Sequence, residues 1–517
     1  LNYYYPIIHQ SPIIGTRVNM SNYVANFDYV IIFFYIVMLI SVGIYSYKKD
    51  STYDQFMLAG RGMTTPMLIS TMVSTYYGLD ILFGSSEMAF NDGLMAFFGY
   101  ALSTLVFYLF IAFYMSKKLR AANFVSLPEI LEKAYGRKTS SIGAVSSMIY
   151  CLPTTSLFAL GRVSEFVFGI DAHYGALLLG GIALGYTLLG GLKAVAITDT
   201  IQFSLMCITV AVGVPLLVHE VGGFAAIKEA VPTGHFEFFG TVPPFLLLAY
   251  ASSSLAVLID PSLYQRIFAS RSAKQARNAI LAATAIWTTF DWLVVAGGIA
   301  ALAAVSKGIL ASNVHPNDAF LIAVTYALPI GLSGIFLAGV LATAMSTIDG
   351  YTLVAGSNIS YDMYRPLIKP DASDKELVKV TKISIVIAWT IGYLVAFQFE
   401  RIMALLIFVT TVILATVFVP VLMALFYQGK KTALAGLLSC SMGLVSVLTF
   451  YIGLSRIGDY NEVWGTYIWT FTLADNTYSI WQEYSLFFCL PISLLGFFIG
   501  NIFGKTTGDN KIRGDLK

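Results

Sequence analysis

The second apolar stretch of the chain contains Val73-Ser-Thr-Tyr-Tyr-Gly-Leu-Asp80, a run of hydroxyl and aromatic residues with Gly78 near its centre. Such a run is a poor helix former, although it lies inside a helix expected over 66–90. Backbone groups left unpaired in hydrocarbon cost several kcal/mol each, so a broken membrane helix is tolerated only around a cavity. The segment therefore predicts a membrane-spanning helix that is interrupted beside an internal cavity.

Composition places the whole chain in a membrane. Of the 517 residues, 57% are hydrophobic and only 12% are charged, and the mean hydropathy is +0.74. A soluble protein carries about 25% charged residues, and a soluble chain this poor in charge could not cover its own surface. Stretches such as 94–115 contain no charge and are long enough to span a bilayer core as a helix. The net charge of +2, without a basic run, argues against a nucleic-acid partner.

Similar apolar stretches recur to the C-terminus and predict an all-α protein with thirteen membrane-spanning helices. We expect them at 28–46, 66–90, 93–116, 140–169, 173–190, 195–218, 242–268, 278–305, 330–364, 380–397, 402–427, 432–454 and 483–504.

Lysine and arginine test that count, because loops that face the cytoplasm are enriched in them. With the N-terminus outside, 25 of the 31 Lys and Arg residues fall on the cytoplasmic side and 5 fall outside. We therefore predict an external extension over 1–27, one transmembrane domain over 28–504 and a cytoplasmic tail over 505–517. The expected location is a plasma membrane, in bacteria the inner membrane.

The seventh apolar stretch also carries breaking signals, Ala251-Ser-Ser-Ser254 followed by Asp260-Pro261. Proline lacks an N–H and disrupts a helix. The two interrupted stretches are five helices apart, which is the spacing expected of two inverted five-helix repeats, about 66–218 and 242–427. The alternative is close packing through Ser and Gly, which is common between membrane helices.

The ninth stretch predicts a cation site. Thr343, Ser346 and Thr347 lie at i, i+3 and i+4, so their side chains share one helix face. Oxygens on one face, opposite the free carbonyls of an unwound segment, suit a hard monovalent cation. The alternative is that these hydroxyls bond to their own helix.

Carboxylates within the spans are costly and are functional candidates by default. Glu165 lies three residues from Arg162 and is expected to neutralise it. Asp260 has no Lys or Arg before Arg266 in its span, so an incoming ammonium group is one expected partner, and capping of a half-helix is the alternative. The full set is Asp80, Glu87, Glu165, Asp199, Asp260, Asp291 and Asp349.

At these segments the chain resembles the sodium–solute symporter family, whose members carry proline, sialic acid, glucose and other solutes. The resemblance covers roughly residues 28–500. It rests on short motifs in matching order, namely Phe56-Met-Leu-Ala-Gly-Arg61, Leu127-Pro-Glu129, Gly190-Gly191 with Ala194, Val195, Thr198, Asp199 and Gln202, Tyr264-Gln265-Arg266, and Met345-Ser-Thr-Ile-Asp349.

The resemblance implies a transporter and not an enzyme. It implies a LeuT-like fold with a five-plus-five inverted repeat, alternating access and sodium as the coupling ion, and no obligate protein partner is evident. The implied sodium ligands are the carbonyls of Ser74, Tyr77 and Thr343 and the hydroxyls of Ser346 and Thr347.

Some family members bind a second sodium through an acid that matches Asp199 and through two serines. In this chain the serine positions hold Asp349 and Gly350. Asp199 and Asp349 are therefore the candidates for a second sodium. Because Gly350 removes a hydroxyl, we predict that transport is coupled to a single sodium.

The resemblance also implies the substrate positions, which fall on Gly78, Ile81, Tyr100, Ser253, Val257 and Asp260. Ile81 and Asp260 stand where sugar-binding members have amides, and Leu152 stands where the sialic acid symporters have an arginine. We therefore predict an amine-bearing solute, either an amino acid or a related zwitterion or cation. The alternatives are a sodium-coupled sugar or organic-acid symporter and, from another class, a membrane sensor built on a transporter fold.

Overall fold

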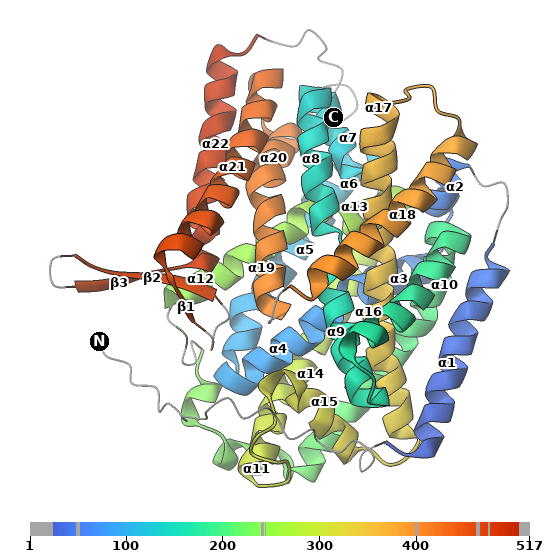
Figure 1. Cartoon of the computed structure of the whole chain (residues 1–517), viewed down its shortest axis with the longest axis vertical. Coiled ribbons are helices and arrows are strands. Elements are labelled where there is room, and N and C mark those ends of the chain that lie inside the picture. Colours follow the sequence, from blue (N-terminus) through green and yellow to red (C-terminus); the bar gives the residue numbers. More distant parts are fainter. Residues whose placement is uncertain are drawn as a thin grey trace.

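The structure is a computed structural model that describes residues 24–47, 52–238, 242, 244–398, 402–461, 466–473 and 476–505. The predicted external extension and cytoplasmic tail lie almost entirely outside these residues. Helices dominate the described part (Figure 1). In the first half of the chain they are α1 (Asn26–Tyr45), α2 (Tyr53–Leu58), α3 (Thr65–Tyr76), α4 (Leu79–Asp92), α5 (Leu102–Phe110), α6 (Ser116–Ala121), α7 (Leu127–Tyr135), α8 (Arg137–Tyr150), α9 (Thr154–Phe168), α10 (Ala172–Glu220) and α11 (Gly223–Ala230).

The second half continues the bundle and adds a small sheet. Its helices are α12 (Pro244–Ser253), the 3-10 helix η6 (Ser254–Ile259), α13 (Pro261–Ala269), α14 (Ala273–Ser306), α15 (Pro316–Ala327), α16 (Leu332–Ser357), α17 (Arg365–Leu367), α18 (Asp374–Ala396), α19 (Ile402–Ile413), α20 (Val419–Phe426), α21 (Ala433–Ile457) and α22 (Ser485–Phe503).

Eleven helical stretches among the described residues are long and apolar enough to cross a bilayer. Two differences separate this number from the expected thirteen. The helix expected over 66–90 is divided into α3 and α4, which have 12 and 14 residues. The helices expected over 173–190 and 195–218 are joined in α10, which has 49 residues. The polytopic all-α class is confirmed, and the count of thirteen crossings stays a prediction.

The long helix α10 turns back on itself at Gly191. A straight α-helix of 49 residues would measure about 74 Å, more than twice a bilayer core of about 30 Å. Gly191 has a φ of 57° and a ψ of −152°, and a Cβ there would collide with the Phe56 carbonyl. The Tyr29 hydroxyl bonds to the Val167 carbonyl just before α10, at the end of the molecule where α1 begins. The next helix, α11, lies at that same end in Figure 1. The chain therefore enters and leaves α10 at one end of the molecule, as a turn at Gly191 requires.

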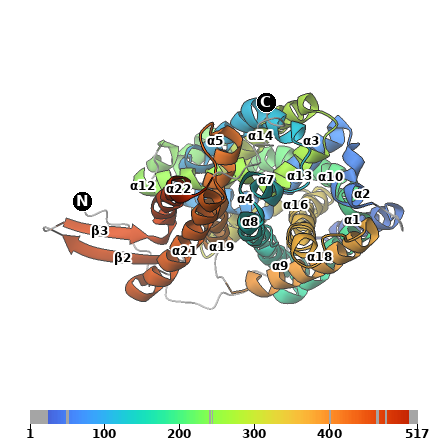
Figure 2. The same cartoon turned by 90° about the horizontal axis from the view of Figure 1, so that it is seen from above.

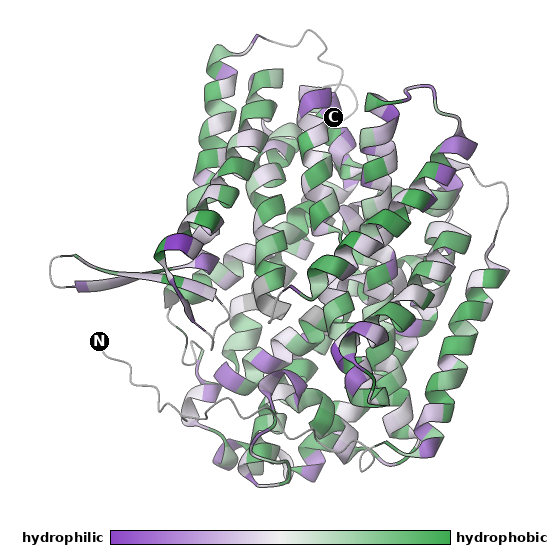
Figure 3. Ribbon diagram, in the orientation of Figure 1, coloured by the Kyte–Doolittle hydropathy of each residue, from purple (hydrophilic) through white to green (hydrophobic). Residues whose placement is uncertain are grey.

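Hydrophobic side chains cover the outside of the bundle as well as its core. Figure 3 shows apolar residues along the outer helices, including α1, α18 and α22. Phe33 and Phe34 of α1, for example, are 61% and 64% exposed. A monomeric soluble protein rarely exposes such large apolar areas. This surface is the one that contacts lipid.

The most enclosed of the described membrane-spanning stretches contains α16, whose side chains are nearly all buried. This helix packs against the parts of α10 before and after the turn at Gly191, and it also contacts α3, α9 and α18. Because α16 runs beside α3, the hydroxyl face predicted on α16 lies next to the interruption between α3 and α4. This central position fixes where a site can form.

The long loop expected over 455–482 contains an antiparallel sheet in the order β1-β2-β3. The strands are β1 (Asp459–Asn461), β2 (Thr466–Leu473) and β3 (Asn476–Trp481). Thr, Tyr, Ile, Trp and Phe dominate β2, and these residues favour strands. Tyr460 pairs with Tyr467, and Phe471 pairs with Tyr478. The sequence predicted only a loop over 455–482, because this stretch lies between two long apolar helices and its strand pattern was not recognised.

Candidate functional site

The first interruption lies between α3 and α4. α3 ends at Tyr76, Tyr77 has a ψ of 72°, and Gly78 is extended with a ψ of 175°. A chain break of this kind leaves the last carbonyls of α3 and the first N–H groups of α4 without helical partners. Gly78 offers no side chain to cap α4. The carbonyl end of α3 carries the negative end of its helix dipole, which attracts a cation.

Serine from α16 meets this carbonyl end. The Ser346 hydroxyl donates to the Ser74 carbonyl oxygen at 2.8 Å and also lies 3.1 Å from the Thr343 carbonyl. The Thr347 hydroxyl donates to the same Thr343 carbonyl at 3.1 Å. Ser346 and Thr347 are only 0% and 5% exposed, so neither hydroxyl points into lipid. The structure thus brings Ser74, Thr343, Ser346 and Thr347 together from two helices.

The remaining predicted sodium ligand, Tyr77, lies at the interruption itself. Its ring packs edge-on against Phe290 of α14, with the ring centroids 5.4 Å apart. Among the described residues, no hydrogen bond joins Tyr77 to α16. The assignment of its carbonyl, and of the whole set, as sodium ligands stays a prediction.

A cavity adjoins these oxygens on the side of Thr347. Three of the predicted substrate residues, Ile81, Ser253 and Val257, line it. Its volume of about 50 Å³ is well below the roughly 300–1,000 Å³ of a typical ligand pocket, so it must widen before a solute enters. The lining residues among those that the structure describes are Tyr76, Ile81, Thr104, Tyr150, Tyr250, Ser253, Ser254, Ala256, Val257, Thr347, Tyr351, Leu406, Ile407 and Thr410.

Four tyrosines dominate this lining, and the sequence interpretation missed all of them. Tyr76, Tyr150, Tyr250 and Tyr351 come from α3, α8, α12 and α16. They share no spacing or motif, so only the packing of four separate helices brings them together. None of the lining residues that the structure describes carries a full charge.

The second interruption, between η6 and α13, is held by Asp260. This residue is fully buried, and its Oδ1 accepts a hydrogen bond from the Leu263 N–H at 2.5 Å. Its Oδ2 accepts from the Tyr351 hydroxyl at 2.9 Å. With Pro261 as the first residue of α13, this is a capped helix start. Asp260 therefore reaches the cavity through side chains of its wall, among them Tyr351.

Two predicted substrate positions remain. Gly78 lies at the first interruption, directly before α4, and is not in the cavity lining. The side chain of Tyr100 lies outside the part of the chain that the structure describes.

The two acids proposed for a second sodium lie deep in the bundle with an arginine. Asp199 of α10 accepts hydrogen bonds from the hydroxyls of Thr71 (2.5 Å) and Thr75 (3.2 Å). Within the described residues, neither carboxylate oxygen of Asp349 meets a donor. All of these side chains are buried.

Arg266 of α13 reaches into this group. Its Nη2 donates to the Thr75 hydroxyl at 2.8 Å, and Thr75 in turn donates to Asp199. A Cβ at Gly350 would lie only 2.7 Å from the same nitrogen. The guanidinium therefore occupies the space in which a side chain at position 350 would stand, and it places a fixed positive charge beside the two acids.

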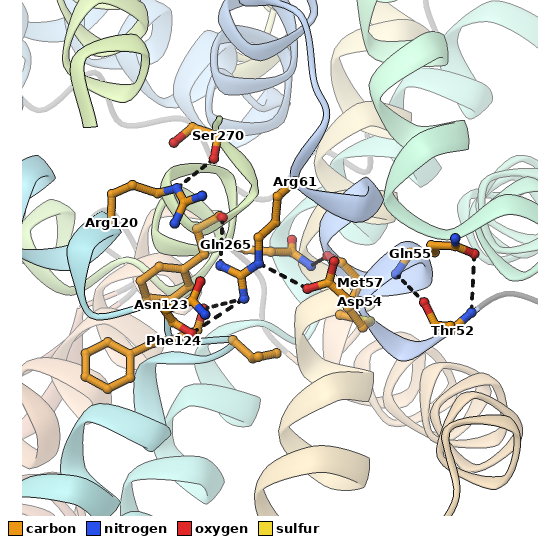
Figure 4. Close-up of polar contacts among 12 residues, drawn as sticks. Thr52, Asp54, Gln55, Met57, Arg61, Arg120, Asn123, Phe124, Gln265 and Ser270 are labelled. Atoms are coloured by element: carbon orange, nitrogen blue, oxygen red, sulfur yellow. Dashed lines mark hydrogen bonds and ion pairs between the residues drawn. The ribbon is translucent and has the colours of Figure 1, made fainter. Parts of the chain in front are cut away.

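A cluster of polar contacts closes the end of the molecule beyond α13 (Figure 4). The Arg61 guanidinium pairs with Asp54 at 3.1 Å and donates to the Phe268 carbonyl at 3.2 Å. Nearby, Arg120 donates to the Ser270 carbonyl at 2.7 Å, and Gln265 donates to the Met57 carbonyl at 2.9 Å. The segment that precedes α3 is thus tied to the end of α13.

This closure was visible in the sequence only as the motif that ends in Arg61. Residues 59–61 all have a positive φ, between 50° and 61°, which is uncommon for alanine and arginine. The turn they form aims the Arg61 side chain at α13. A passage from the cavity toward this end requires these contacts to part.

Comparison with known proteins gives a family profile and distant relatives. Residues 56–443 match the Sodium:solute symporter family. The chain is 26% identical to the sodium/proline symporter 2 of Staphylococcus saprophyticus, over 88% of this chain and 92% of that protein. It is 26% identical to the sodium/glucose cotransporter of Vibrio parahaemolyticus (73% and 76%). It is 25% identical to the high-affinity choline transporter 1 of Caenorhabditis elegans (80% and 76%).

Solved structures agree on the fold. A Na+-coupled sialic acid symporter superposes with a TM-score of 0.75 at 16% identity, over 93% of this chain and 99% of that chain. A nucleobase-cation-symport-1 family transporter superposes with a TM-score of 0.55 at 12% identity, over 89% and 97%. Both are LeuT-fold transporters, so the expected fold class is confirmed.

Proposed function

The chain belongs to the Sodium:solute symporter family, and we propose that it couples inward sodium flow to the uptake of a zwitterionic or cationic solute that bears an amine. The family makes it a sodium-coupled membrane transporter and not an enzyme. The ligand set, the solute class, the direction of flow and the orientation in the membrane are the proposal. In it the N-terminus lies outside and the C-terminus in the cytoplasm, in a bacterial inner membrane.

One contact carries the sodium assignment, the 2.8 Å hydrogen bond from Ser346 to the Ser74 carbonyl across the interruption. Sodium would separate these two oxygens and bind both, because it is attracted to the carbonyl end of α3. The carbonyls of Thr343 and Tyr77 and the hydroxyl of Thr347 would complete the shell. Unwound carbonyls and hydroxyls of this kind are the usual sodium ligands of broken-helix transporters.

The tyrosine-lined cavity supports an amine as the solute. Ammonium groups are attracted to the faces of aromatic rings. The Tyr351 hydroxyl also donates a hydrogen bond to Asp260. The negative charge of that carboxylate therefore polarises a hydroxyl in the cavity wall. A carboxylate on the same solute would face the start of α4, which has no side-chain cap and whose helix dipole favours an anion. Ile81, in the first turn of α4, lines the same cavity as the tyrosines. The ammonium group and the carboxylate of one solute could therefore bind within one pocket.

We expect transport by alternating access, in which the cavity opens to one side of the membrane at a time. The contacts of Arg61, Arg120 and Gln265 hold one side of the cavity shut. Binding of sodium to α3 and α16 would reposition α3, and α3 is continuous with the segment that carries Arg61. Opening on this side would then depend on both ligands being present.

Uptake in proteoliposomes tests the proposal. We would compare labelled proline, choline, glucose and sialic acid with and without an inward sodium gradient. The expected result is sodium-dependent uptake of an amine-bearing solute alone. Uptake of glucose or of a carboxylate without an amine would overturn the solute class, and gradient-independent uptake would overturn the coupling. Binding without any uptake would favour the sensor alternative.

A further inference from the structure

The sheet in the loop between α21 and α22 has two chemically different faces. In an antiparallel pair, directly opposed residues point to the same side, and successive residues along a strand alternate. One face therefore carries Tyr460 and Tyr467, Trp469 and Ile480, and Phe471 and Tyr478 as opposed pairs. Beyond the base of the hairpin, the opposite face carries Thr470 with Ser479 and Thr472 with Thr477.

The aromatic face carries two groups of rings, and the rings within each group contact one another. The ring centroids of Tyr460 and Tyr467 are 5.2 Å apart, those of Trp469 and Phe471 are 4.7 Å apart, and those of Phe471 and Tyr478 are 5.8 Å apart. Nevertheless Tyr460 and Tyr478 remain 43% and 48% exposed. On the polar face, the Thr470 and Ser479 hydroxyls bond to each other at 3.2 Å. The sheet is thus strongly amphipathic and does not bury its aromatic side against the bundle.

The orientation of the sheet places it at a membrane boundary. The strands join the end of α21 at Ile457 to the start of α22 at Ser485, two helices that span the bilayer. Figure 1 shows the sheet edge-on, projecting sideways from the ends of these helices and away from the bundle. Seen from above in Figure 2, its strands lie flat beside the bundle. A sheet that leaves the ends of two spanning helices sideways is held by its connections close to the bilayer surface on that side.

The two spans that lead to the sheet also expose apolar side chains. Phe488 of α22 and Ile452 and Ile457 of α21 are 45%, 60% and 57% exposed on the spans that lead to the sheet. Tyr and Trp are enriched where proteins meet the headgroup region. An open sheet is not tolerated in the hydrocarbon core, because its edges need polar surroundings, and the hydrated interface provides them.

We propose that the β1–β3 sheet lies on the bilayer as an interfacial anchor, with its aromatic face in the headgroup region of the leaflet where α21 ends. The occupant of this face is lipid, and it is neither solvent nor a second protein. The polar Thr and Ser face is turned to the aqueous side. This anchor is independent of which solute is carried.

Spin labels on neighbouring residues test the proposal in the full-length protein reconstituted into phosphatidylethanolamine–phosphatidylglycerol liposomes. Phe471→Cys and Thr472→Cys place a label on opposite faces at adjacent positions. The parent carries Cys207→Ser, because Cys207 is half-buried while Cys151, Cys440 and Cys489 are buried. Collision with oxygen reports lipid, and collision with a water-soluble nickel chelate reports water.

We expect the oxygen-to-nickel collision ratio to be about threefold or more higher at position 471 than at 472, as for aromatic-belt positions. Tyr478→Cys and Thr477→Cys repeat the comparison on β3, so that local loosening by one substitution cannot produce the result. Equal ratios in both pairs, or a higher ratio on the Thr face, would overturn the proposal. Dipolar broadening between labels at position 471 would also overturn it, because it would show a second copy on that face.

Discussion

The two interrupted helices of this protein differ in which groups bond to the helix ends at the interruption. At the first interruption, α4 begins without a side-chain cap, and Ser346 from another helix donates to the Ser74 carbonyl at the end of α3. At the second, the α13 start is filled by its own Asp260, whose other oxygen is bound by Tyr351. The first interruption is open to a ligand, and the second is satisfied from within the protein.

This difference assigns separate tasks to two segments that look alike in sequence. A carbonyl end attracts a cation, and a helix start attracts an anion. Because Asp260 already provides that anion, the second interruption has no need of an external one and instead shapes the cavity wall. The two interruptions are therefore not interchangeable, and the following variants separate them.

The largest effect is expected at the first interruption. Replacing Ser346 by Ala and Thr347 by Val together removes two hydroxyl oxygens from the sodium shell. At about 1–3 kcal/mol for each lost polar ligand, half-saturating sodium should rise about 100-fold. Sodium-dependent uptake in proteoliposomes measures it.

The matched control is Thr352→Val, on the same helix. Thr352 is buried, and within the described part of the chain its hydroxyl bonds to the Ile348 carbonyl of its own helix. Half-saturating sodium should stay within about twofold of the parent in this variant. Equal sodium affinity in the double variant and in the control would remove the cation site from α16.

A smaller effect is expected at the second interruption. Asp260→Asn removes the charge but retains a residue that caps a helix start as well as Asp does. The KM for an amine-bearing solute should rise about tenfold with little change in Tm, since about 1.4 kcal/mol corresponds to tenfold. Asp260→Ala removes the cap as well and should destabilise the protein by about 0.5–2 kcal/mol. An unchanged KM in Asp260→Asn would show that the charge of Asp260 does not contribute to binding of the solute.

Tyr351→Phe tests how the charge reaches the cavity, and its effect should be smaller again. The variant keeps the ring but removes the hydroxyl that donates to Asp260. We expect KM to rise about three- to fivefold, because the aromatic contact with the ammonium group is retained. Tyr393→Phe, which loses a hydroxyl that bonds to the His173 carbonyl at the periphery, is the control. A larger KM change in Tyr351→Phe than in Asp260→Asn would reverse the proposed order of action.

The last prediction is that the second interruption adds no ion to the cycle. Arg266, which follows it on α13, fills the space beside Gly350 and places its own charge near Asp199 and Asp349. The reversal potential of solute-coupled current should therefore correspond to one sodium per solute. A ratio of two would show that the acid pair binds sodium despite the arginine.

Local signals predicted the parts of this protein that depend on one segment. Gly78 and the preceding hydroxyl and aromatic residues marked the first interruption, and the i, i+3, i+4 spacing placed Ser346 and Thr347 on one face of α16. For Asp260, the sequence left open a ligand role and a capping role. The structure shows the cap, because the Leu263 N–H lies within 2.5 Å of its Oδ1.

Contacts between distant segments were beyond reach of the sequence. The four cavity tyrosines come from four helices and have no common spacing. The position of Arg266 beside Gly350 joins residues that are 84 positions apart, so no periodicity links them. The sheet between α21 and α22 depends on register between strands, which composition does not specify.

By itself the sequence determined that this chain is a polytopic helical membrane protein, where its helices are interrupted and which hydroxyls share a face. Those properties follow from hydropathy, helix propensity and the 3.6-residue turn, which act within one segment. Only the tertiary structure decided what each interruption faces. Ser346 lies opposite Ser74, Tyr351 opposite Asp260, and Arg266 beside Gly350. Such pairings depend on how helices pack side by side, and many packings satisfy the same hydropathy pattern.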